Sequence, residues 1–153
     1  MDPCLYVFAA DALLEAGHLR PGVVERMSKI DWDRRSLAIL IDMRVVGDAE
    51  DRDRLVEETM DLVCRATARP RDRWSLRPPL LLCPHAQVHV RLCGCQAPSI
   101  DTFRAIARRS SLRLDQMLYV APAGEQAMAA AIGLPFVRAE AFFGHNAQAR
   151  RVA

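Results

Sequence analysis

The chain has 153 residues, of which 51% are hydrophobic and 26% are charged. This length and composition predict one globular domain with a substantial apolar core. The formal net charge of +2 excludes a protein that binds nucleic acid mainly through a strong basic field. No apolar run approaches the length of about 18 residues that a membrane span needs. The N-terminus lacks a basic region before its apolar stretch, so we expect no signal peptide and a cytoplasmic chain.

Short apolar runs alternate with helical patterns along the chain. Strands are predicted at 4–10, 37–41, 80–82, 117–120 and 134–137, and helices at 23–30, 50–66, 98–109 and 124–132. The strand runs are short and apolar rather than alternating, which is typical of strands buried on both faces. The sequence therefore predicts an α/β fold, in which a Rossmann-like parallel sheet is covered by helices on both faces.

Three of the five cysteines lie close together with a histidine. Cys83, His85, Cys93 and Cys95 form a C-x-H and a C-x-C pair, and thiolates with imidazole are the ligands of a tetrahedral Zn²⁺ site. His89 is the alternative to His85. Because four protein ligands leave no open position, we expect a structural zinc ion rather than a catalytic one. The other reading is three cysteines without metal beside a surface histidine.

The two remaining cysteines lie outside this cluster. Cys4 falls in the first predicted strand and Cys64 in a predicted helix, so we expect both in the core. An odd number of cysteines in a cytoplasmic chain argues against a disulfide framework.

The zinc motif and its surroundings resemble a known family. CPH…CGC, followed by a helix and preceded by a strand that ends near Asp11, resembles the zinc-loop haloacid dehalogenase-like phosphatases, the histidinol-phosphate and heptose-bisphosphate phosphatase group. HLRPGVV at 18–24 and AMAAAIGLPFV at 127–137 are similar to family segments, and EAFFG at 140–144 resembles endings in related polynucleotide phosphatases.

The resemblance implies a domain organisation. It extends from Leu5 to about Gly144, and we expect residues 1–144 to form a single domain that contains a zinc loop at 83–95, with residues 145–153 as a C-terminal tail. It also implies a Rossmann-like sheet without a large cap domain, with the site at the carboxyl ends of the strands. Ligands generally bind at that edge in open α/β sheets.

The catalytic motifs of that family are changed here. Its first motif, D-x-D, falls on residues 9–11, so the nucleophile position holds Ala9, and only Asp11, in the acid/base position, remains. The phosphoryl-binding Thr or Ser after the second strand corresponds to Ile41, and the lysine after the zinc loop corresponds to Ala97.

The acidic pair that holds Mg²⁺ in the family corresponds to Pro122 and Gln126. The segment between Asp11 and Gly22, which forms a flap over the substrate in the family, is only about ten residues long. The resemblance therefore implies a scaffold without a nucleophile, phosphate-binding groups or Mg²⁺ ligands, so neither covalent catalysis nor bound Mg²⁺ is expected.

The leading hypothesis is a catalytically inactive, zinc-binding pseudo-phosphatase that acts as a binding or scaffold module through protein–protein interaction. Its former site would be apolar and would bind a protein segment or be packed shut. The lining residues would be Ala9, Ile41, Ala97, Ala121 and Pro122.

The alternative is a divergent phosphatase for sugar, histidinol or nucleotide monoesters. It would use Asp11, with Asp42 or Glu125 as a second carboxylate. Asp42 also reads as a solvated loop residue, and Asp11 as a helix-cap or loop residue.

A third hypothesis is nucleic-acid contact through an arginine-rich strip that would grip phosphates and stack a base. The strip comprises Arg65, Arg69, Arg71, Arg73 and Arg77, with Trp74 among them. It also reads as a solvated connection. Trp32, Trp74 and the pair Phe142 and Phe143 would anchor a protein partner if they were exposed.

Overall fold

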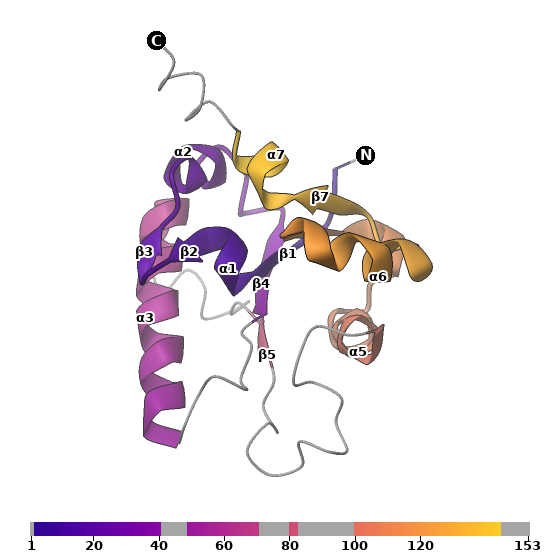
Figure 1. Ribbon diagram of the computed structural model, residues 1–153, viewed down its shortest axis with the longest axis horizontal. Coiled ribbons are helices and arrows are strands. Elements are labelled where there is room, and N and C mark those ends of the chain that lie inside the picture. Colours follow the sequence, from indigo (N-terminus) through magenta and orange to yellow (C-terminus); the bar gives the residue numbers. More distant parts are fainter. Residues whose placement is uncertain (1, 41–48, 71–79, 83–99, 145–153) are drawn as a thin grey trace.

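The computed structural model describes residues 2–40, 49–70, 80–82 and 100–144 (Figure 1). Within these ranges, one five-stranded sheet contains β1 (Leu5–Ala9), β4 (Ser36–Leu40), β5 (Leu80–Leu82), β6 (Met117–Ala121) and β7 (Phe136–Arg138). The order across the sheet is β5-β4-β1-β6-β7, and every neighbouring pair is parallel. β1 therefore lies at the centre, and the predicted parallel α/β sheet is confirmed.

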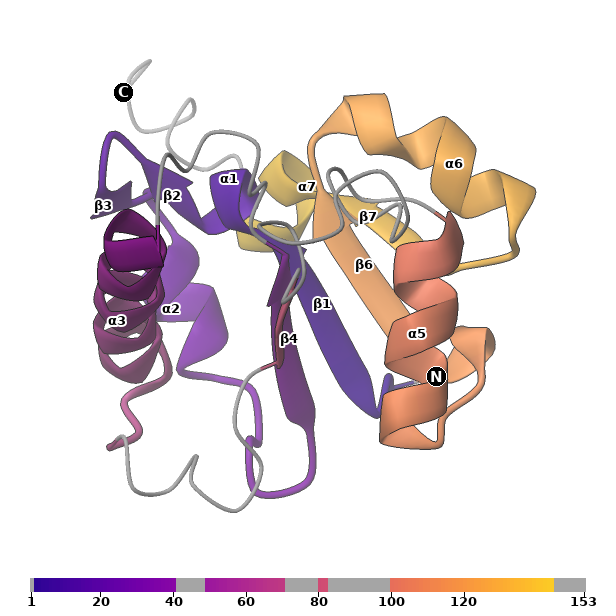
Figure 2. The same ribbon diagram turned by 90° about the horizontal axis from the view of Figure 1, so that it is seen from below.

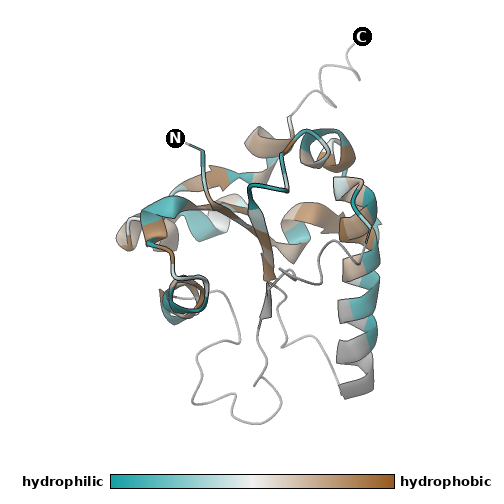
Figure 3. Ribbon diagram, turned by 180° about the vertical axis from the view of Figure 1, so that it is seen from behind, coloured by the Kyte–Doolittle hydropathy of each residue, from teal (hydrophilic) through white to brown (hydrophobic). Residues whose placement is uncertain are grey.

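Helices cover both faces of this sheet, as the sequence predicts. α2 (Val23–Met27) and α3 (Ala49–Thr67) lie on one face, and α5 (Ile100–Ser110) and α6 (Gln126–Ala131) lie on the other (Figure 2). Figure 3 shows hydrophobic ribbon along the central strands and hydrophilic stretches on the surrounding helices. Among the described residues, no helix combines the length and apolar composition that crossing a bilayer requires.

The central strand is buried along its whole length. All five residues of β1 are buried, because strands pair with it on both sides and helices cover both faces. Tyr6 and Phe8 point to the same face, as expected for residues two apart in a strand. Tyr6 packs edge-on against Trp32 at 5.6 Å between ring centroids, and Phe8 packs against Phe142 at 5.7 Å. An aromatic layer thus fills one side of the core.

The start of β1 corrects one prediction. β1 begins at Leu5, and Cys4 is exposed, so the expectation that Cys4 lies in the core is wrong. The backbone of Cys4 still continues the sheet, since its amide donates to the Gln116 carbonyl at 2.8 Å and its carbonyl accepts from Ser36 at 2.9 Å. Its side chain lies at the amino edge, beyond the first register pairs. Cys64 is half-buried and packs against the core, as expected.

Other element bounds differ by a few residues for local reasons. β7 starts at Phe136 rather than 134, because Pro135 has no N–H to donate, although its carbonyl accepts from Tyr119 at 2.9 Å. The helix predicted at 124–132 begins as a 3₁₀ turn, η4 (Ala123–Glu125), and continues as α6.

Several short elements had no counterpart in the sequence analysis. β1 is followed by a one-turn helix, α1 (Ala10–Leu13), and by a hairpin of β2 (Leu14–Glu15) and β3 (His18–Leu19). α7 (Ala139–Phe143) follows β7. Each is too short to show a helical or strand period, which is why the sequence pattern missed them.

Gly22 brings α7 against α2. It has a φ of +85°, and a Cβ at this position would lie 2.5 Å from the Phe143 carbonyl oxygen. Only glycine permits both this backbone conformation and this approach. The guanidinium of Arg26 in α2 lies 4.4 Å above the Phe142 ring of α7. These contacts hold α7 beside the aromatic layer over β1.

Candidate functional site

The carboxyl ends of the parallel strands meet at one edge of the sheet, where ligands bind in open α/β folds. β1 ends at Ala9, which pairs with Leu40 at the end of β4. On the other side, Ala121 follows Val120, the register partner of Phe8. Ala9, Leu40 and Ala121 are all buried, with 6% or less of their surface exposed. The centre of this edge is therefore apolar.

Asp11 lies just beyond that centre, in the first turn of α1, and is exposed. Arg20, which follows the hairpin, donates from Nε to the backbone carbonyl of Asp11 at 2.8 Å. Its Nη1 atom lies 3.8 Å from the Glu15 carboxylate. Arg20 thus ties the hairpin to α1 through the backbone carbonyl of Asp11.

Glu125 lies in the turn η4, which follows β6, the neighbour of β1 on the side opposite β4. Its amide donates to the Pro122 carbonyl at 3.1 Å, which closes the turn. The side chain is half-buried. Burial raises the pKa of the Glu125 carboxyl, and the negative charge of Asp11 raises it further. Asp11 and Glu125 thus follow two neighbouring strands, β1 and β6, at the same edge of the sheet.

Tyr119 lies in β6, two residues before the end of the strand, and is fully buried. Its ring packs against Phe103 at 4.7 Å and Phe136 at 5.7 Å, whereas its hydroxyl is buried and has no hydrogen-bond partner among the described residues. Burial raises the pKa of Tyr119 well above its usual range, and the charges of Glu125 and Asp11 raise it further. A buried hydroxyl without a partner is rare in folded proteins and costs stability.

The positions that the resemblance assigns to the magnesium ligands hold no carboxylate. Pro122 is half-buried at the end of β6. Gln126 is engaged by β7, because its Oε1 atom accepts from Arg138 Nη2 at 3.3 Å and Nε at 3.4 Å. Among the described residues, no three His, Cys, Asp or Glu side chains come together as a metal site.

The remaining predicted site residues lie outside the described ranges. This holds for the four expected zinc ligands and for the positions after the second strand and the zinc loop. They are Cys83, His85, Cys93 and Cys95, with the alternative His89, and Ile41, Asp42 and Ala97.

The arginine strip is only partly described. Arg65 is exposed, and Nη1 of Arg69 lies 3.2 Å from the Asp33 carboxylate, in an ion pair that a phosphate group would have to displace. Arg71, Arg73, Trp74 and Arg77 lie outside the described ranges.

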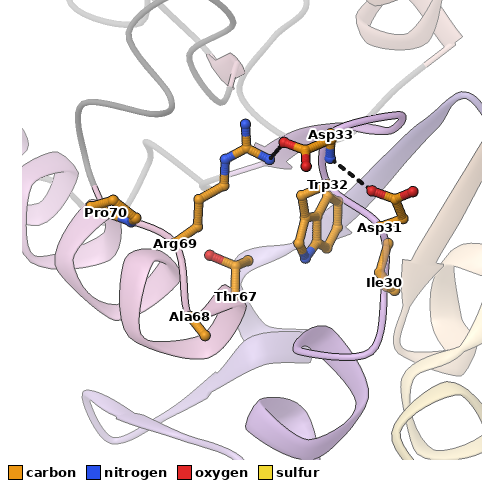
Figure 4. A pocket seen from close by; sticks show the side chains of 8 residues that line it. All are labelled: Ile30, Asp31, Trp32, Asp33, Thr67, Ala68, Arg69 and Pro70. Atoms are coloured by element: carbon orange, nitrogen blue, oxygen red, sulfur yellow. Dashed lines mark hydrogen bonds and ion pairs between the residues drawn. The ribbon is translucent and has the colours of Figure 1, made fainter.

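Arg69 also lines a cavity at the opposite, amino edge of the sheet (Figure 4). The cavity measures about 300 Å³ and is bounded by residues 30–33 and 67–70. Its wall includes Trp32, which is buried and donates from Nε1 to the Met27 carbonyl at 2.8 Å, so it is not an exposed anchor for a partner. The Thr67 hydroxyl donates to the Val63 carbonyl at 2.8 Å. The Trp32 indole and the Thr67 hydroxyl are therefore both engaged in hydrogen bonds to the backbone.

No family model matches this sequence, and searches of curated proteins and of solved structures found no match. A functional proposal therefore depends on the residues and on their geometry.

The sequence pattern singled out Asp11 and Glu125 but not Tyr119. In the sequence, Tyr119 is one member of an apolar strand, MLYV, and nothing there marks its hydroxyl as unpartnered. The available signal was a tyrosine near the end of a largely buried strand, because a buried tyrosine hydroxyl usually needs a hydrogen-bond partner.

Replacing this tyrosine tests the geometry of the site. We expect Tyr119→Phe to raise the free energy of unfolding by about 1 kcal/mol, because it removes a buried hydroxyl that has no partner. Tyr119→Leu, the control, should lower it by roughly 1–3 kcal/mol, since the ring contacts are lost. Urea unfolding followed by circular dichroism measures both variants. A Tyr119→Phe protein less stable than the wild type would contradict this description of the hydroxyl.

Proposed function

We propose that this chain is a zinc-binding, haloacid dehalogenase-like domain that has lost phosphatase chemistry and acts as a binding or scaffold module for another protein. The observation that carries the proposal is the end of β1 at Ala9, in the centre of the sheet's carboxyl edge. The resemblance assigns the phosphorus-attacking nucleophile to this position. A buried methyl group has no atom that can attack.

The surroundings of Ala9 support the same view. Ala121 is apolar and buried, and Pro122 and Gln126 stand where the resemblance expects the Mg²⁺ ligands. Phosphoryl transfer needs positive charge to offset the charge that develops on the transferring group. The described part of this edge instead carries two carboxylates, Asp11 and Glu125, which would repel a phosphate ester.

The short flap also argues against catalysis. The segment after β1 forms only the single turn α1 and the small hairpin of β2 and β3. Closing a site and excluding water strengthens the electrostatic interactions that catalysis uses. Among the described residues, this flap of two-residue strands covers little of the carboxyl edge.

Zinc would stabilise the segment that joins β5 to α5. The chain between β5 and α5 carries the predicted ligands, and β5 lies at one edge of the sheet while β6, the strand after α5, lies on the far side of β1. β5 and β6 therefore lie on opposite sides of the central strand. Metal binding contributes directly to folding where a loop has little core of its own.

A second candidate function, phosphate-monoester hydrolysis through Asp11, is favoured by one observation. Burial and the charge of Asp11 raise the pKa of Glu125, which is the direction that suits a general acid, and Glu125 and Asp11 follow the neighbouring strands β6 and β1. This candidate would need a nucleophile other than residue 9.

An activity assay separates the two candidates. We expect the full chain with Mg²⁺ to release no phosphate above background from a panel of sugar, histidinol and nucleotide monophosphates. The panel is read by inorganic phosphate release, with Asp11→Asn as the matched control. Turnover in the wild type that disappears in Asp11→Asn would overturn the pseudo-phosphatase proposal in favour of the second candidate.

Metal analysis tests the zinc component. Native mass spectrometry should find about one Zn²⁺ per chain, as expected for a four-ligand structural site. Cys83→Ser and Cys95→Ser should each lose the metal and several kcal/mol of stability. Cys4→Ser, at an exposed position, should change neither. A zinc-free wild-type preparation that keeps the same melting temperature would refute the zinc assignment.

A further inference from the structure

We draw no further inference here: the strongest candidate, the cavity of about 300 Å³ between residues 30–33 and 67–70 at the amino edge of the sheet, has its Arg69 guanidinium engaged by Asp33 and is bounded at Pro70 by the end of a described range, so nothing in the structure shows what covers or fills it.

Discussion

The hydrogen bonding of β1 to a strand on each side fixes the position of the candidate site. β4 and β6 hydrogen-bond to its two edges, helices cover its two faces, and all five of its residues are buried. Parallel strands carry their following loops to the same edge, so the end of β1 is the centre of the candidate site. Because β1 ends at Ala9, the centre of this edge is a buried methyl group. The acidic side chains, Asp11 and Glu125, lie instead in the segments that follow β1 and β6.

The sheet could be predicted because its signal is strong in the sequence. LYVFA and MLYVA are almost wholly apolar, as is SLAIL after its first residue, and that pattern is typical of strands buried on both faces. The short elements could not be predicted, since α1 and α7 span a single turn and have no measurable period. Cys4 was misplaced because an apolar run does not reveal where helix cover ends.

The sequence predicted where the candidate site lies, but not how its side chains pack. Strand order brings Asp11 and Glu125 to adjacent loops, and the sequence pattern identified both. That the Tyr119 hydroxyl has no hydrogen-bond partner among the described residues depends on how its ring packs against Phe103 and Phe136, which no local pattern encodes. The zinc ligands remain a prediction from the spacing of Cys83, His85, Cys93 and Cys95 and from the resemblance.

A crystal structure of the full chain grown with Mg²⁺ and beryllium fluoride, a mimic of a transferring phosphoryl group, tests the central claim most directly. A scaffold that has lost phosphatase chemistry should leave the tip of β1 without either group, with anomalous scattering at the zinc edge placing one metal ion between Cys83 and Cys95. A fluoroberyllate bound at the carboxyl edge, with a divalent ion beside the Asp11 carboxylate, would contradict it.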